Sequence, residues 1–189
     1  MSRPRGRPAK GEGLSKDDIL SAALALLDEG GGTGLTMRAL AASLGITPMS
    51  LYHHVADHAA LLRALADKVY GGVREESACG ADPVCAIRQL LQRYYAVVTQ
   101  HPQLTLAIFS EPQAFAGVNQ EITDQLTSWL AALTSDAALW RDILIDHAHG
   151  CGLARVAVAA DPAQAALLQA RYLQALDCLL AQIGSGGSR

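Results

Sequence analysis

Hydrophobic residues recur at intervals of three and four along most of the chain, a spacing that indicates helices rather than strands. In the first such run, Ile19, Ala23 and Leu27 share one face, after a serine and two aspartates typical of a helix start. Three consecutive glycines from Gly30 end the run, because their backbone freedom disfavours a helix. Alternating polar and β-branched residues, the pattern of strands, do not stand out. The sequence therefore predicts an all-α protein.

Two short helices follow, each introduced by a threonine suited to capping. Thr36 precedes an apolar stripe that includes Leu40, and Gly45 supplies a sharp stop. Thr47 precedes the next helix, in which Pro48 occupies the first position, where a missing N–H costs nothing. These signals predict two helices of only a few turns, separated by a tight turn.

Longer helices fill the remainder of the chain. Asp57 suits the start of a helix that continues to Gly71, and the polar segment Ser77–Asp82 marks a boundary after it. Beyond it, we expect helices over Pro83–Gln100, Pro102–Phe109, Val118–Leu133, Asp136–Ala159 and Pro162–Ile183. The predicted architecture has about nine helices in three parts: a flexible arm (1–13), a three-helix head with the following helix (14–76), and a C-terminal helical region (77–189).

Composition and cysteine content narrow the class of protein. The chain has 189 residues, half of them hydrophobic, which is enough for a packed core. It has no apolar run of about 18 residues and no secretory signal, so we expect a soluble, cytoplasmic protein without membrane partners. The cysteines Cys79, Cys85, Cys151 and Cys178 form no CxxC pair, and we expect them to be reduced thiols.

Charge is distributed unevenly along the chain. Arg3, Arg5, Arg7 and Lys10 lie within the first ten residues, which contain no acid. The rest of the chain carries 11 basic against 18 acidic residues, a formal charge of −7, although the whole chain has only −3. A basic arm before an acidic body favours a nucleic-acid contact through the arm.

The two short capped helices have the spacing of a helix-turn-helix, whose second helix enters the major groove of DNA, about 12 Å wide. We interpret residues 47–54 as that recognition helix, with polar and apolar side chains suited to base edges and phosphates. The candidate DNA contacts are Thr36, Arg38, Thr47, Pro48, Met49, Ser50, Tyr52, His53, His54 and His58. From spacing alone, a small helical hairpin with solvated polar residues is the alternative.

The run from Thr36 to Val55, TMRALAASLGITPMSLYHHV, resembles the DNA-binding head of the tetracycline-repressor (TetR) family of bacterial regulators. The resemblance continues into Ala60-Leu61-Leu62 and covers roughly residues 15–70. It implies a DNA-binding head, a small-molecule pocket among the C-terminal helices and a homodimer formed through the last two helices, numbered 8 and 9. By residue matching, the family's DNA contacts fall on Arg38, Pro48, Met49, Tyr52 and His54.

One departure from the family concerns phosphate binding. Where lysines are frequent in the family, this chain has Ala56-Asp57-His58, and residues 35–58 carry no net formal charge. The N-terminal Arg3-Pro4-Arg5-Gly6-Arg7-Pro8 resembles an AT-hook, whose central glycine lets the backbone approach the floor of the minor groove. We therefore expect the arm to supply affinity that the head lacks.

Aromatic residues gather only in the C-terminal region, where a pocket would form. We nominate Tyr94, Tyr95, Phe109, Trp129 and His147 as pocket residues, with an apolar or aromatic effector because charge is scarce there. Aromatic residues at helical spacing also serve as plain core, and that alternative stays open.

The terminal helix is apolar on more than one face, and the helix before it carries small residues at Gly150, Gly152, Ala154 and Ala157. A helix so apolar exposes a large patch unless another surface covers it. Pairing of helices 8 and 9 across a two-fold axis would cover it, as would packing within one subunit.

These observations predict a ligand-responsive DNA-binding transcriptional regulator, a repressor released from a near-palindromic operator. One alternative is an architectural DNA-binding protein without an effector. An enzyme is the other: His147, His149 and Cys151 lie close in sequence, but on a helix only His147 and Cys151 share a face, too few ligands for a zinc site. We expect no catalytic residues, no metal and no cofactor.

Overall fold

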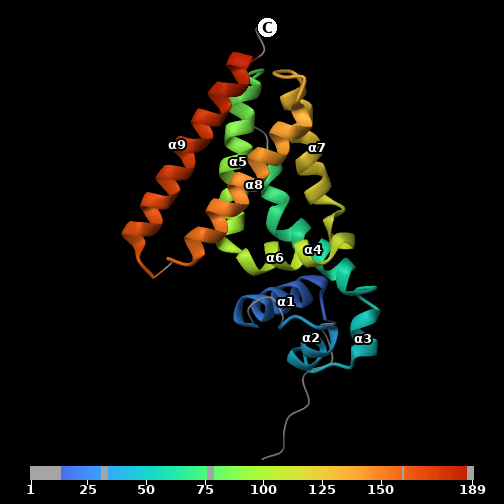
Figure 1. Cartoon of the computed structure of the whole chain (residues 1–189). Helices are drawn as coiled ribbons and strands as arrows, with labels where there is room; N and C mark the ends of the chain where they lie inside the picture. Colours follow the sequence, from blue (N-terminus) through green and yellow to red (C-terminus); the bar gives the residue numbers. More distant parts are fainter. Residues whose placement is uncertain (1–13, 31–33, 76–78, 159, 187–189) are drawn as a thin grey trace, which may run out of the picture.

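Every regular element in the described part of the chain is helical, as predicted (Figure 1). The computed structural model describes residues 14–30, 34–75, 79–158 and 160–186. The arm, with its AT-hook-like motif of Arg3, Arg5, Arg7 and Lys10, lies outside the described residues.

The head consists of α1 (Lys16–Gly30), α2 (Met37–Ser43) and α3 (Pro48–Tyr52), and α4 (His58–Tyr70) leads away from it. Its first helix begins as the sequence predicts. The Asp18 amide donates to Ser15 Oγ at 3.1 Å, while the Ser15 amide donates to Asp18 Oδ2 at 3.1 Å, so two backbone donors at the helix start are satisfied reciprocally.

The C-terminal region is a bundle of longer helices. Its elements are the 3₁₀ turn η1 (Gly71–Arg74), α5 (Pro83–Gln100), α6 (Pro102–Ser110), the 3₁₀ turn η2 (Pro112–Phe115), α7 (Val118–Ala131), α8 (Ala137–Val156) and α9 (Pro162–Gly186). The predicted bounds hold for α5 and miss the ends of α6, α7, α8 and α9 by one to three residues. The two 3₁₀ turns were not predicted, because their bonds span only three residues and leave no apolar periodicity.

Helix α5 contacts α7, α8 and α9 of the bundle. Helix α8 approaches α5 closely at Gly152, where a Cβ atom would lie 2.6 Å from Val98 Cγ1. Gly152 therefore serves packing within the subunit, whereas Gly150 is exposed with open space around it. The small residues of α8 thus do not form one surface.

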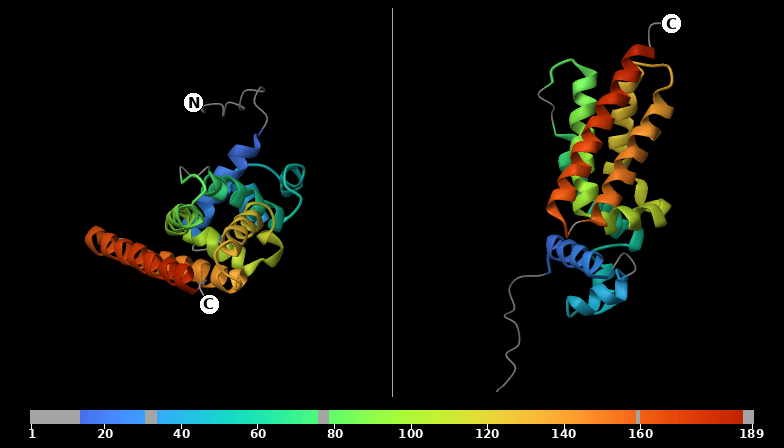
Figure 2. Two further views of the ribbon diagram at one scale, coloured as in Figure 1. Left: turned by 90° about the horizontal axis from the view of Figure 1, so that it is seen from above. Right: turned by 60° about the vertical axis from the view of Figure 1, so that its left-hand side comes forward.

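Helix α9 lies on the outside of the bundle, against α5 and α8 (Figures 1 and 2). Tyr172 is buried and its hydroxyl donates to the Leu91 carbonyl at 2.9 Å. Arg88 Nε donates to Asp177 Oδ1 at 2.6 Å, which holds the pKa of the Asp177 carboxyl below its usual value. These contacts fix which face of α9 packs inward.

The head and the bundle share one hydrophobic core, which runs from Ile19 in α1 to Ile183 in α9. Helix α1 packs against α6, and α4 contacts α6, α7 and η2 as well as α1. In Figure 1, α4 runs from the head into the bundle. A movement of α4 would therefore change contacts in both the head and the bundle.

The loop before α5 corrects one prediction. Cys79 and Cys85 form a disulfide, with their Cα atoms 5.6 Å apart, so the expectation of four reduced thiols is wrong for this pair. The first turn of α5 brings Cys85 back over the loop, a closure that a six-residue spacing does not reveal. Cys151 and Cys178 are free.

Among the described helices, none combines the length and the apolar character needed to cross a membrane.

Candidate nucleic-acid interface and ligand cavity

Helices α2 and α3 are held by their own side-chain caps. The Ala39 amide donates to Thr36 Oγ1, and the Ser50 amide donates to Thr47 Oγ1, both at 3.1 Å. Gly45 joins them in the left-handed region, at φ 66°, which side chains rarely adopt. Local sequence thus sets the angle between the two helices.

Helix α3 attaches to the head by one face only. Leu51 is fully buried and Val55 nearly so, next to the buried Leu40 of α2. On the other face, Met49 is 70% exposed and Tyr52 is 47% exposed. Large apolar side chains left in solvent on a helix of five residues indicate a surface that another molecule covers.

The remaining predicted DNA contacts divide into exposed groups and structural groups. The exposed ones, which leave their side chains available to a ligand, are Arg38, Pro48, Ser50, His53 and His54. The hydroxyls of Thr36 and Thr47 accept from backbone amides as caps, and Thr47 Oγ1 also lies 3.1 Å from Ser50 Oγ, but Thr36, Thr47 and Ser50 are all exposed. His58 is half-buried, and its Nε2 lies 3.2 Å from the Leu35 carbonyl oxygen. His58 thereby links the start of α4 to the segment before α2.

Helices α1 to α4 carry few cations, and two of these are engaged. Lys68 pairs with Asp17 of α1, and the Arg63 guanidinium donates to the Gln113 carbonyl at 2.6 Å. Arg38 makes no hydrogen bond or ion pair with the described residues, so its guanidinium is available to phosphate or guanine. Helix α3 itself contains no Asp, Glu, Lys or Arg residue.

A cavity of about 470 Å³ lies between α5, α6, α7 and α8, in the range of small-molecule sites. A narrow extension leads from it toward α4, where Tyr70 and Thr105 lie with their hydroxyl oxygens 2.8 Å apart. The residues that line the main cavity are Tyr94, Phe109, Phe115, Asn119, Gln120, Ile122, Thr123, Arg141, Asp142, Ile145, Asp146 and His149.

The inner end of the cavity is aromatic and neutral. The Tyr94 hydroxyl oxygen lies 2.6 Å from His149 Nε2, and the Phe109 ring meets the His149 ring edge-on, with centroids 4.7 Å apart. Burial lowers the pKa of His149 to about 4 and raises the pKa of Tyr94 well above its usual value. Both side chains are therefore uncharged at neutral pH.

The structure brings two of the five nominated pocket residues together, Tyr94 and Phe109. Tyr95 instead stacks on Tyr172 of α9, with centroids 4.0 Å apart, and His147 stacks on the same ring at 5.3 Å. His147 also lines an open, largely apolar hollow on the outer face of α9. These two residues join α9 to the bundle and do not line the central cavity.

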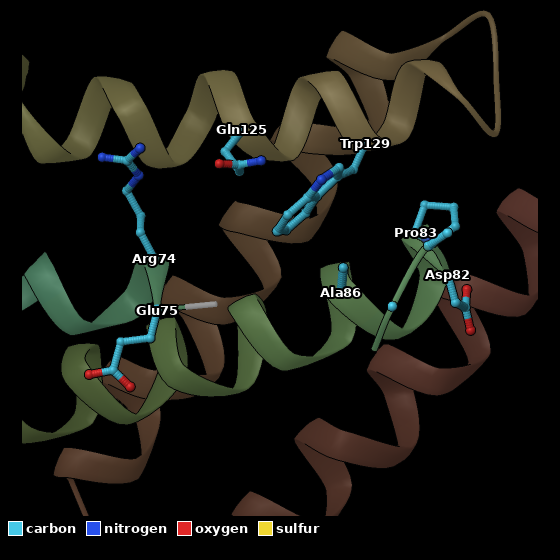
Figure 3. Close-up of a pocket in the computed structure, with 9 residues that line it drawn as sticks. Arg74, Glu75, Asp82, Pro83, Ala86, Gln125 and Trp129 are labelled. Carbon is cyan, nitrogen blue, oxygen red and sulfur yellow. The ribbon is translucent and has the colours of Figure 1, made fainter. Parts of the chain in front are cut away.

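Trp129 lines a second cavity, of about 400 Å³, between α7 and the start of α5. Figure 3 shows Trp129 and Gln125 of α7 on the side facing Pro83 and Ala86. This cavity adjoins the disulfide loop and shares none of its lining residues with the central one.

Sequence reasoning missed His149, Phe115 and Asn119. The signal for the histidine was present, since His147 and His149 point to opposite sides of α8 and only one can face the bundle interior. Periodicity alone could not show which of the two histidines faces the interior. The contact of His149 with Tyr94, 55 positions earlier, shows that it is His149.

His147 does share a face with Cys151, whose Sγ lies 3.7 Å from the His147 Nδ1. The described residues contain no group of three side chains able to hold a metal.

Apolar side chains are also exposed on the outer faces of α8 and α9. In α8, Leu139 is 60% exposed, Ile143 36% and Val156 37%, and in α9 Leu167 is 49% exposed. Arg171 is exposed on α9, whereas Arg155 Nε is buried without a hydrogen-bond partner among the described residues. Neither arginine forms an ion pair within the described residues.

Curated relatives match part of the chain. Over 56 residues, 30% of this chain and 26% of the relative, it is 48% identical to the class D tetracycline repressor protein of Escherichia coli. Over 104 residues, 53% of this chain and 43% of the relative, it is 36% identical to an HTH-type transcriptional regulator of Saccharopolyspora erythraea. The chain thus spans only about a quarter to less than half of the length of these relatives.

Solved structures match nearly the whole chain. BioQ of Mycobacterium smegmatis superposes with a TM-score of 0.75 and 28% identity over 92% of this chain and 100% of that one. BioQ solved with its double-stranded DNA operator has a TM-score of 0.69 and 27% identity, over 91% and 99%. TetR of Acinetobacter baumannii, at 22% identity and a TM-score of 0.71 over 94% and 100%, shares the fold. Residues 19–65 match the model of the bacterial regulatory proteins of the tetR family, so this segment of the chain is similar to that family.

Proposed function

We propose that this protein is a ligand-responsive transcriptional regulator, a repressor that leaves a near-palindromic operator when a small apolar or aromatic effector binds. The observation that carries the proposal is the pairing of an uncovered recognition face on α3 with a ligand-sized cavity, joined by α4. The BioQ structure with its operator supports DNA as the partner. No enzymatic activity is part of the proposal.

Helix α4 makes three polar contacts with the walls of the cavity. Arg63 donates to the Gln113 carbonyl in η2, and Tyr70 bonds with Thr105 in α6. Asp67 Oδ1 accepts from the Val118 amide, the first residue of α7, at 3.2 Å. An effector that favours a different position of these walls would shift α4 and with it the head.

The exposed apolar faces of α8 and α9 support a homodimer as the functional unit. A four-helix interface from two copies would cover Leu139, Ile143 and Leu167. Two heads in such a dimer would present recognition helices about 34 Å apart, one turn of B-DNA. The near-palindromic operator follows from this two-fold symmetry.

The basic arm completes the proposed interface by contacting the minor groove. Removal of residues 2–10 takes away Arg3, Arg5, Arg7 and Lys10 from each subunit. We expect weaker operator binding and a salt dependence of log K shallower by up to about 3.6 per subunit, since each of four phosphate contacts contributes about 0.9. A salt titration of both proteins measures this; equal affinities and equal slopes would remove the arm from the interface.

Selection of bound duplexes from a random DNA pool tests the proposed function. The expected product is a near-palindrome whose half-sites are centred about one turn apart. Loss of operator affinity on adding an effector would distinguish the regulator from an effector-independent architectural protein. Recovery of unrelated sequences with no two-fold symmetry would contradict the proposal.

A further inference from the structure

Asn119, in the first turn of α7, is a buried polar residue of the cavity whose side-chain amide nitrogen has no hydrogen-bond partner within the part of the chain that the structure describes. Its side chain is 6% exposed and lines both the main cavity and the narrow extension toward α4. Among the described residues, its Nδ2 has no hydrogen-bond partner. Because a buried N–H group without a partner is unfavourable, the site gains from a ligand that carries an acceptor to this point.

The neighbours of Asn119 make that end of the cavity neutral. Tyr94 and His149 are hydrogen-bonded to each other at 2.6 Å, and burial keeps both uncharged at neutral pH. Neither of these two neighbours can offset a ligand's negative charge. A neutral acceptor, such as a carbonyl oxygen, suits this environment better than a carboxylate.

The mouth of the cavity also disfavours anions. Its cation, Arg141, is engaged by its neighbour: the Arg141 Nε donates to Asp142 Oδ1 at 2.8 Å. Asp146 adds a further carboxylate to the lining. One arginine against two aspartates leaves a net negative charge that repels an entering carboxylate.

The walls favour a flat ring system. Phe109 is 52% exposed and Phe115 is 40% exposed, and both line the cavity rather than the core. Two partly exposed phenylalanines, from the adjoining elements α6 and η2, offer ring faces to a planar aromatic ligand in this cavity of about 470 Å³.

We propose, as a refinement that rests on the proposed function, that the effector is an uncharged planar aromatic molecule whose carbonyl-type acceptor binds Asn119. Recognition of the acceptor acts directly on α4, because Val118, the residue before Asn119, donates its amide to Asp67. Gly117 makes this approach possible: it has φ 76°, and a Cβ there would lie 3.0 Å from Asp67 Oδ1.

Three probes of one shape test the ligand chemistry on the wild-type protein. They are 2-acetylnaphthalene, 2-ethylnaphthalene and 2-naphthoate, which present a neutral acceptor, no acceptor and a charged acceptor. By calorimetric titration, we expect the ketone to bind roughly fivefold to tenfold more tightly than the hydrocarbon, as one buried hydrogen bond provides. The carboxylate should bind more weakly than the ketone. Equal affinities, or preference for the carboxylate, would overturn the inference.

Two variants locate the acceptor. Asn119→Leu removes the amide and should make the ketone and the hydrocarbon bind equally, while far-ultraviolet circular dichroism and thermal unfolding check its folding. Gln125→Leu is the matched control, because it is an amide on the same helix that lines only the second cavity. It should keep the ketone preference. A preference retained in Asn119→Leu and lost in Gln125→Leu would place the ligand in the second cavity and refute the assignment.

The outcome is separable from that of the proposed function. A near-palindrome selected from the random pool, together with no ketone preference, would overturn the ligand assignment and leave the DNA-binding regulator intact. A clear ketone preference without any selected palindrome would overturn the DNA-binding regulator and leave the ligand assignment intact.

Discussion

The α2–α3 segment and the cavity between α5 and α8 differ in how far along the chain their determining contacts reach. In the head, Thr36 and Thr47 bond to amides three residues ahead, and Gly45 sets the turn between them. In the cavity, Tyr94 meets His149 across 55 positions, and Asp67 meets Val118 across 51. The reading surface is built locally, whereas the cavity exists only once the bundle has assembled.

The largest effect is expected from a pair of matched core substitutions, one in α3 of the head and one in α7 of the bundle. Leu51 in α3 and Leu126 in α7 are both fully buried, so each change to alanine should cost about 2–5 kcal/mol of unfolding free energy in urea titrations. Leu51→Ala should also lose operator binding at temperatures where the protein is folded, because α3 is anchored chiefly by that side chain. Leu126→Ala should retain it. Equal operator affinities in the two variants would show that α3 does not depend on its local anchor.

The second prediction concerns acid and the bundle. The pKa of His149 is about 4 in the folded protein against 6.5 for an unperturbed histidine, so the unfolded chain binds the proton more readily. Stability should therefore be unaffected above pH 6.5 and fall between pH 6.5 and 4, by about 3 kcal/mol at the lower limit. Urea titrations over this range measure the loss. His149→Asn should flatten the profile, and an unchanged slope in that variant would contradict the assignment.

The third prediction isolates the exposed face of α3. Met49→Ala with Tyr52→Ala should weaken operator binding by about 10- to 100-fold, the range for lost groove contacts. Because both side chains are exposed, unfolding free energy should change by less than about 0.5 kcal/mol per site. Ser128→Ala, at an exposed position of α7, is the control. Anisotropy titrations that find no loss for the double variant would take this face out of the interface.

The smallest effect concerns the cap that begins α4. The Ala60 amide donates to Asp57 Oδ1 at 2.6 Å, so Asp57→Ala should cost about 1 kcal/mol of stability. The change also removes an acid from the head, so operator affinity should hold or rise while thermal stability falls. A fall in both would indicate that the cap positions the head for DNA.

The number of positions that separate contacting residues along the chain also explains which features the sequence could predict. The caps at Ser15, Thr36, Thr47 and Asp57 and the turn at Gly45 were all anticipated, because each acts within a few residues. Helix ends were less accurate, since terminal turns close by three-residue bonds such as that from the Ala132 amide to the Trp129 carbonyl.

Residues whose role depends on distant partners were predicted poorly. Tyr95 and His147 are residue types that often line pockets, but both stack on the ring of Tyr172 in α9. Asn119 gave no signal, since an asparagine early in a helix reads as ordinary solvated surface. The Cys79–Cys85 disulfide escaped prediction because its closure depends on where α5 begins.

The central claim is that two α3 helices of a dimer read one operator together. Its most direct test compares the selected near-palindrome with a duplex in which five base pairs are inserted between the half-sites. That insertion rotates one half-site by about half a turn of DNA. The account predicts an affinity loss of at least about 100-fold for the inserted duplex, approaching non-specific binding. Equal affinity for the two duplexes would contradict it.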